Sequence, residues 1–239
     1  MNGQSVKGRV RITKFQAGFF VLVLFSAALT AQGQQASNTE HEVWPEIQIF
    51  IPLSERFRLF IMVREQRSAE ALDKSEGVAG LHLDYFWKNK WLLRTGYRYR
   101  RSFGPRPVNE NRWLFEGTYS QPLPKQFTLR DRSVEEFRWL NGNFSTRFRN
   151  RAMLERKLGL GKRSLVPYAA GEIFYDTRFD SFNRYRVTTG VRILFKETNG
   201  LLLNLRRQKT LDVYYVWQHD SHAQPARVQA LGIILGINF

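Results

Sequence analysis

The last polar segment of the chain contains the residues best suited to catalysis or metal binding. His219, Asp220 and His222 lie close together, and Ser221 stands between them. A catalytic histidine needs a carboxylate that orients its ring, and two neighbouring histidines are conceivable zinc ligands. Ser221 lacks the Gly-x-Ser-x-Gly turn that exposes the nucleophile of α/β-hydrolases. We therefore interpret the segment as a solvated loop, and predict no catalytic, cofactor-binding or metal-binding residue.

A larger set of charged residues recurs at every second position along the chain. The formal net charge is +16, and most of the basic residues are arginine. The arginines that share one predicted face are Arg58, Arg64, Arg94, Arg98, Arg100, Arg112, Arg130, Arg132, Arg149, Arg151, Arg184, Arg186 and Arg192. The acids on the same face are Glu46, Asp84, Glu116, Glu155, Glu172, Asp176 and Asp212. Arginine is preferred where its planar guanidinium enters enclosed ion-pair networks.

These charges admit two interpretations. They pair across the interior of a barrel and fill it, because small barrels are filled by side chains and buried charges must be paired. Alternatively, the surplus arginine lines a narrow polar lumen that favours anions, as rings of Arg or Lys do in pores. Both interpretations require the same pattern of residues, so the sequence leaves them open.

The elements that position these charges are β-strands. In residues 90–102, large apolar side chains such as Trp91 and Leu93 alternate with Arg94 and Arg98, which is the period of a strand. The same period predicts strands near 43–51, 57–67, 77–87, 90–102, 111–121, 127–139, 146–158, 166–176, 184–195, 209–218 and 228–239. The predicted fold class is therefore all-β, an antiparallel up-and-down barrel.

Alternation alone does not say which face of the barrel is apolar. A secreted soluble ligand-binding barrel turns its apolar face inward, and a transmembrane barrel turns it outward. The apolar stripes are long enough for a tilted strand to cross a bilayer, and aromatic residues such as Trp87 and Trp91 gather at stripe ends. Connections also alternate between short turns and longer loops, among which we place residues 139–145. These features favour the transmembrane barrel.

The number of strands is predicted as 10–12. The segments above would leave the two ends of the barrel domain on opposite sides of a membrane, whereas single-chain bacterial barrels have even strand numbers. The apolar stretch at 201–205 offers an additional strand. We therefore expect 12 strands.

The N-terminal residues have the features of a secretory signal. Lys7, Arg9, Arg11 and Lys14 precede an apolar run, and small residues follow at 31 and 33. We predict a signal peptide at 1–33 that is cleaved after Gly33, a short segment at 34–42 and a barrel domain at 43–239. The chain has no cysteine, which excludes disulfides and lipid attachment through cysteine.

Several segments together resemble a known family. They include Arg-Asn-Arg at 149–151, the strand at 167–175 and Asn-Arg-Tyr-Arg at 183–186. Residues 42–239 resemble the Bacteroidota outer-membrane β-barrel family labelled domain of unknown function 2490. The resemblance implies a barrel in the outer membrane of a Gram-negative bacterium, with no established catalytic residues. It also implies that the terminal Phe239 is part of the signal read by the barrel-assembly machinery.

The function that the sequence favours is non-enzymatic. We expect a structural barrel or a narrow anion-permissive channel, with outer-membrane lipid and lipopolysaccharide as its surroundings. An outer-membrane hydrolase with a rim site at His219 and Asp220 is the second hypothesis. Nucleic-acid binding is not expected, because the alternation puts Arg and Tyr on opposite faces of the sheet. No cofactor is implied, and the oligomeric state is left open.

Overall fold

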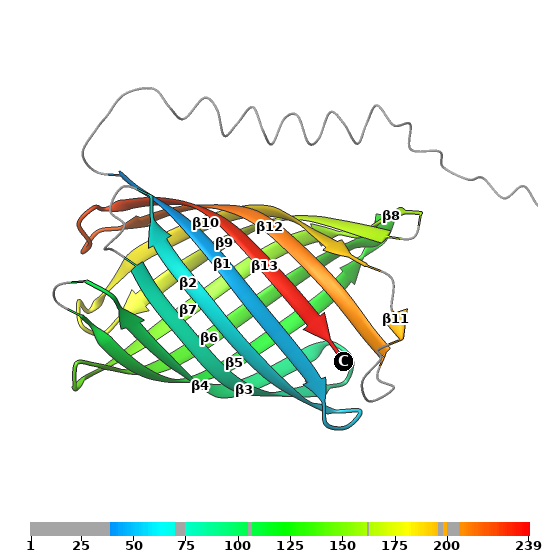
Figure 1. Cartoon of the computed structure of the whole chain (residues 1–239), viewed down its shortest axis with the longest axis horizontal. Coiled ribbons are helices and arrows are strands. Elements are labelled where there is room, and N and C mark those ends of the chain that lie inside the picture. Colours follow the sequence, from blue (N-terminus) through cyan, green and yellow to red (C-terminus); the bar gives the residue numbers. More distant parts are fainter. Residues whose placement is uncertain (1–38, 70–74, 105–106, 162, 196–197, 200–205) are drawn as a thin grey trace, which may run out of the picture. The chain divides into compact units, whose positions relative to one another are not determined.

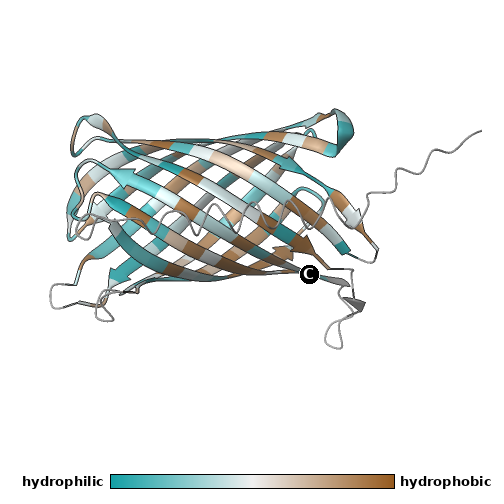
Figure 2. Cartoon of the chain, turned by 90° about the horizontal axis from the view of Figure 1, so that it is seen from above, coloured by the Kyte–Doolittle hydropathy of each residue, from teal (hydrophilic) through white to brown (hydrophobic). Residues whose placement is uncertain are grey.

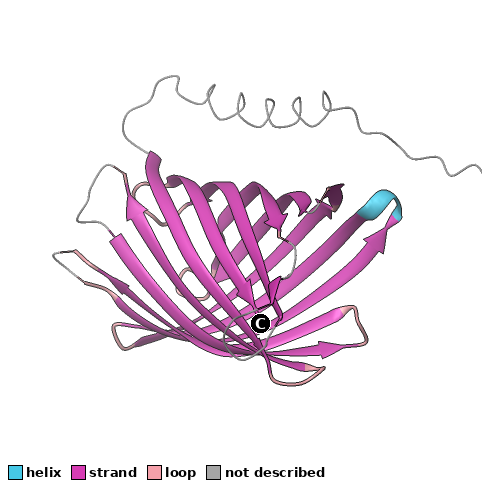
Figure 3. Ribbon diagram, turned by 45° about the vertical axis from the view of Figure 1, so that its right-hand side comes forward, coloured by secondary structure: helices cyan, strands magenta, loops and turns pink. Residues whose placement is uncertain are grey.

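A computed structural model describes residues 39–69, 75–104, 107–161, 163–195, 198–199 and 206–239. The strands are β1 (Thr39–Pro52), β2 (Phe57–Ser68), β3 (Ser75–Trp87), β4 (Trp91–Ser102), β5 (Asn109–Leu123), β6 (Phe127–Leu140), β7 (Asn143–Arg156), β8 (Leu158–Leu160), β9 (Arg163–Asp176), β10 (Ser181–Leu194), β11 (Thr198–Asn199), β12 (Arg206–Asp220) and β13 (Arg227–Asn238). Among these residues the one helical piece is a 3-10 turn at Pro124–Gln126 (Figure 3). No described helix is long and apolar enough to span a bilayer. The all-β prediction is confirmed.

Eleven long strands of the described chain close into a barrel (Figure 1). Neighbours along the chain pair antiparallel, and β8 and β11 are short strands attached to β9 and β12. The ring closes where β1 pairs with β13 in parallel, with Val43 opposite Leu231 and Ile47 opposite Leu235. The total lies within the predicted range, but the expectation of 12 strands is wrong. An odd number makes the first and last strands run in the same direction, so the closing pair is parallel.

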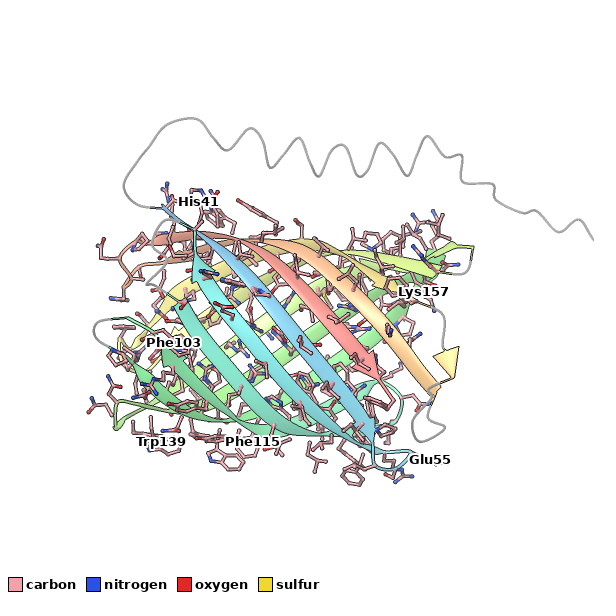
Figure 4. All side chains as sticks on the ribbon, in the orientation of Figure 1. His41, Glu55, Phe103, Phe115, Trp139 and Lys157 are labelled. Atoms are coloured by element: carbon pink, nitrogen blue, oxygen red, sulfur yellow. The ribbon has the colours of Figure 1, made fainter. Side chains whose placement is uncertain are left out.

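The parallel closure puts the start of β1 and the end of β13 at opposite ends of the barrel (Figure 1). His41 and Phe103 mark the end where β1 begins, and Glu55 and Lys157 mark the end where β13 stops (Figure 4). The predicted signal peptide, its cleavage after Gly33 and the apolar stretch at 201–205 lie outside the described residues.

Two of the hairpins are set by residues with positive φ. Lys88 and Asn89 have φ of 49° and 56°, and Asn141 and Gly142 have φ of 47° and 87°. Two successive positive φ angles are the geometry of a type I′ turn, whose twist matches that of the flanking strands. The longer loop predicted at 139–145 is therefore wrong, because Asn-Gly forms a two-residue turn there.

Apolar and polar positions alternate along each strand (Figure 2). The outward positions carry large apolar side chains that are 39–57% exposed: Val43, Ile47, Val63, Leu81, Leu93, Phe115, Leu129, Phe148, Ile173, Val187, Val213, Leu231, Ile233 and Leu235. Outward aromatic residues include Trp87 and Trp91 beside the turn between β3 and β4. The inward positions carry most of the charged residues. The barrel is thus apolar outside and polar inside.

Candidate functional site

The interior of the barrel contains a cavity of about 1240 Å³. Glu40 and Ser75 line it at the end where β1 begins, and Phe50 and Asn238 line it at the other end. The cavity therefore runs along the barrel between its two ends. We call it the lumen.

The structure brings the predicted interior charges together around the lumen. The predicted residues that line it are Arg58, Arg64, Arg94, Arg98, Arg100, Arg112, Arg130, Arg132, Arg149, Arg151, Arg184, Arg186, Arg192, Glu46, Glu116, Glu172 and Asp212. Glu155 is buried and forms ion pairs with Arg130 (2.7 Å) and Arg192 (3.6 Å). Asp84, also buried, binds Arg58 and Arg94, both at 2.6 Å. The interior is thus rich in arginine and bridged by salt bridges.

The most deeply buried part of this network lies on β5, β6, β7 and β9. Arg138, whose side chain is 2% exposed, contacts Glu110 Oε1 through Nε (2.5 Å) and Asp176 Oδ2 through Nη1 (2.9 Å). Arg112 joins Glu110 (2.7 Å) to Glu136 (3.0 Å). These shared contacts pair carboxylates that are removed from water with arginine, which favours their ionised form, while Glu110 Oε2 and Glu136 Oε2 have no hydrogen-bond partner in the described chain. We call this part of the interior the ionic wall.

Four members of this network were not predicted from the sequence: Glu110, Glu136, Arg138 and Arg147. All four occupy the same alternating positions as arginines that were assigned inward, for example Glu136 and Arg138 two and three steps of alternation after Arg132. Glu136, Arg138 and Arg147 lie within strands predicted above, so alternation applied at every position finds them, and Glu110 lies one residue before a predicted strand.

Two lumen arginines have no carboxylate partner among the described residues. Arg98 donates through Nε to His82 Nε2 at 2.9 Å and lies opposite Arg112 in the sheet. Arg151 lies opposite Arg132, and its buried Nε has no hydrogen-bond partner. Like charges directly opposite each other destabilise a strand pair. The lumen therefore carries positive charge that the protein itself does not neutralise at these two positions.

A comparison with family models gives a match for the greater part of the barrel. The model described as "Protein of unknown function (DUF2490)" matches residues 41–229, from β1 to β13. The chain belongs to this DUF2490 family. No curated protein and no solved structure matches the chain.

A second part of the DUF2490 lumen is apolar. Trp44, Tyr168, Tyr214, Val216 and Ala230 pack together inside the barrel, close to the parallel pair β1–β13. We call this part the aromatic wall. Its rings pack against inward glycines: a Cβ at Gly190 would come within 2.8 Å of Tyr168, and one at Gly232 would overlap the ring of Tyr214. Glycine is required there because the backbone and a ring approach too closely for any side chain.

The aromatic wall forms side-chain hydrogen bonds through Trp44, whose Nε1 donates to the Glu42 carboxylate, and through the hydroxyl of Tyr168. Tyr168 donates to Asp212 at 3.0 Å, and Asp212 also accepts from Arg192 at 3.2 Å. The ring of Trp44 lies under the guanidinium of Arg186 at 5.2 Å, which is a cation–π distance. Two arginines of β10, Arg186 and Arg192, therefore connect the aromatic wall to the charged interior.

The residues of the predicted rim site are not brought together in this DUF2490 chain. The ring of His219 packs outside against Tyr185, 5.1 Å away, whereas Asp220 points inward and is held by Arg184 and Asn183. The ring of His222 stacks on Phe179 at 4.1 Å. Adjacent strand residues face opposite sides of a sheet, so Asp220 does not orient the ring of His219. Within the described ranges no group of three His, Cys, Asp or Glu is arranged to hold a metal ion.

Phe239 and Asp176, which were both predicted from the sequence, lie near the ends of the barrel. The backbone N–H of Phe239 donates to the carbonyl of Phe50 at 3.0 Å, which extends the β1–β13 pair. In the turn after β9, Arg178 donates to both carboxylate oxygens of Asp176 (2.9 and 2.8 Å), and this hydrogen bonding raises the pKa of Arg178 above its ordinary value. The Arg178 contact covers the end of the ionic wall.

Proposed function

We propose that the chain is a non-enzymatic outer-membrane β-barrel of a Gram-negative bacterium of the Bacteroidota, and that its lumen is a narrow, anion-permissive passage. The apolar outer surface supports the location, because it can face lipid. The closed ring of strands supports it as well, because only a closed barrel or a helix satisfies every backbone group in lipid. Outward aromatic residues such as Trp87 and Trp91, which lie at strand ends, fit the aromatic girdles of such barrels.

We also propose that signals at the two ends of the chain direct it to the outer membrane. A signal peptide at 1–33 directs export and is cleaved after Gly33, and the barrel-assembly machinery reads a signal that includes Phe239. The loops then meet lipopolysaccharide, for which exposed basic residues such as Arg227 are suited.

One observation carries the proposal about the lumen. Arg98 and Arg151 face a cavity that runs between both ends of the barrel, and neither has a carboxylate partner among the described residues. Fixed positive charge on the wall of a narrow pore lowers the electrostatic barrier for anions and raises it for cations. The paired charges of the ionic wall narrow the passage without adding to this charge.

The location is tested on outer-membrane fractions. We expect the chain in these fractions, with a gel mobility in detergent that changes on boiling, because folded barrels resist detergent until they are heated. Absence from the outer membrane, or mobility that boiling does not change, would contradict the location.

The lumen is tested by planar-bilayer recordings under a salt gradient. We expect small currents whose reversal potential indicates anion preference, and we expect this preference to fall in the double variant Arg98→Gln/Arg151→Gln. The matched control is Arg227→Gln, which removes an exposed charge at the start of β13 outside the lumen and should leave the preference unchanged. Currents indistinguishable from those of an empty bilayer would contradict the passage while leaving the barrel intact.

A further inference from the structure

The outer surface of β6 and β7 has a polar centre. Asp131, Ser133 and Glu135 occupy successive outward positions of β6, and Asn150 occupies an outward position of β7 beside them. We call these four residues the outer polar patch. The other outward-facing charged residues of the described strands lie near strand ends: Glu65, Arg67, Arg101, Arg156, Arg163, Lys209 and Arg227. Glu135 instead lies in the middle of β6, between Phe115 of β5 and Phe148 of β7.

The residues of the outer polar patch form only some of their possible hydrogen bonds with one another. Asn150 donates through Nδ2 to Asp131 Oδ1 at 2.8 Å and to Ser133 Oγ at 3.1 Å. The carboxylate of Glu135 has no hydrogen bond or ion pair with any described residue. A charged side chain at this depth of a bilayer is rare and marks a functional site, because hydrocarbon offers it no partner.

An apolar hollow adjoins the patch on the same outer face. It has a volume of about 910 Å³, and Ser133, Glu135 and Asn150 are part of its lining together with Phe115 and Phe148. Gly117 also lines it, and a Cβ there would meet nothing closer than Leu93 at 3.9 Å. The outer surface of the barrel is therefore recessed at Gly117, where no side chain projects. Phe115 projects outward from the barrel (Figure 4). The hollow therefore offers apolar surface and one unpaired carboxylate side by side.

The chemistry of this surface distinguishes among possible occupants. A lipid chain would fill the hollow but would leave Glu135 without a partner. A second copy in the same membrane, related by an axis along the membrane normal, would place Glu135 near another Glu135. It would bring no cation to that depth, because the outward cations of the described strands lie near strand ends. A different protein with a basic side chain at mid-depth satisfies both the hollow and the carboxylate.

We propose that the outer polar patch and the hollow bind a membrane-embedded protein partner whose apolar surface presents a lysine or arginine to Glu135. The inference rests on the proposed location in the outer membrane. An ion pair shielded by apolar surroundings on both partners is screened little by salt, so it contributes orientation and specificity to the contact.

Photo-crosslinking in intact outer membranes tests the partner. A photoreactive amino acid replaces Phe115 in the hollow, and the matched control replaces Ile233, which is outward on β13 on another part of the barrel. We expect a protein adduct from position 115 and none from position 233. The cross-linked peptide should be apolar and contain a lysine or arginine.

Variants at Glu135 make the test specific for the charge. We expect Glu135→Leu to lower the adduct yield about tenfold, the change that corresponds to about 1.4 kcal/mol, and Glu135→Asp to retain most of it. Reversal of both charges, with Glu135→Lys and an acid in place of the partner's basic residue, should restore the adduct. Mobility change on boiling confirms that each variant is folded.

Several outcomes would overturn the proposal. They are adducts only with lipid, adducts only with a second copy, an unchanged yield with Glu135→Leu, and no adduct in chains that are present in the outer membrane. The fractionation separates this failure from failure of the proposed function, because a chain absent from the outer membrane contradicts the location itself.

Discussion

The ionic wall and the aromatic wall lie inside the same barrel but are built in different ways. The ionic wall buries Glu110, Glu136 and Arg138, each 0–2% exposed, and holds them by shared salt bridges. The aromatic wall buries Tyr214 at 8% exposure against glycine-containing backbone near the parallel pair. The salt bridges of the ionic wall join nitrogen and oxygen atoms over a range of distances, whereas a ring packed against a glycine backbone fits in one arrangement. One barrel interior is therefore specified by electrostatics on one side and by shape on the other.

The largest expected effect is a disulfide bond across the parallel pair β1–β13, beside the aromatic wall. Cysteines replacing Val43 and Leu231, which are opposite each other in β1 and β13, should form a disulfide on mild oxidation, and the chain has no other cysteine. Adjacent strands lie about 4.8 Å apart, within the Cα range of disulfides. Non-reducing gels of fully unfolded protein detect the closed covalent loop.

The matched control for the pair replaces Val43 and Leu235. These positions are offset by about 13 Å along the strands, because each residue of a strand advances about 3.3 Å. We expect no disulfide in this variant. A disulfide in the offset pair alone would mean that the aromatic wall is closed in a different register.

The next largest effect is a loss of stability when a charge of the ionic wall is removed. Arg138→Ala leaves Glu110 and Asp176 without a shared buried partner, and breaking a buried pair in this way costs about 3–5 kcal/mol of unfolding free energy. Arg130→Ala should cost under about 1 kcal/mol, because Arg130 is 37% exposed and forms one ion pair within the described part of the chain. Urea unfolding in lipid vesicles, followed by tryptophan fluorescence, measures both. Equal losses would show that burial does not distinguish the two arginines.

A smaller effect is expected when the aromatic wall is overfilled. Gly232→Val puts a side chain where the Tyr214 ring lies, and overpacking of this kind costs about 1–3 kcal/mol. Gly171→Val is the control, because an added Cβ there meets nothing within 4 Å. We expect its stability to be unchanged or slightly raised, since valine favours strands. If both variants unfold at the same urea concentration, the fit between ring and glycine is not what stabilises this wall.

The smallest effect is expected outside both walls. His219→Ala removes a ring that packs on the outer surface against Tyr185, and we expect a change within about 0.5 kcal/mol, as for other surface substitutions. Asp220→Ala should cost more, because Asp220 is 4% exposed and its loss leaves Arg184 without its carboxylate. Unfolding in vesicles compares the two. A larger loss for His219→Ala would point to a role of that ring which the structure does not explain.

Much of the fold could be predicted from the sequence, because alternation is a local property of a strand. Each predicted strand corresponds to a long strand of the structure, and the arginines assigned inward line the lumen. The turn at Asn141-Gly142 was missed although Asn-Gly is a strong local signal for a two-residue hairpin. The outer polar patch was also visible as alternation, with Asp131 and Glu135 at outward positions of β6.

The partners of individual charges could not be predicted in the same way. Arg138 contacts Glu110 on the preceding strand and Asp176 two strands away, and no spacing in the chain relates these residues. Similarly, no described carboxylate lies beside Arg98 or Arg151, and this depends on which side chains the register places next to them. Counting charges gives the excess of arginine but not the positions where it remains unpaired.

The sequence by itself determined which residues form strands and which side of each strand is polar, because a strand reverses the direction of its side chains at every residue. Only the tertiary structure decided how the barrel closes. β1 and β13 are far apart in the chain, and their parallel pairing depends on the number of strands and the stagger between them, which are properties of the whole sheet. That closure places Gly232 beside Tyr214 and Arg98 opposite Arg112, and so decides where the lumen is filled by rings and where its positive charge faces the cavity.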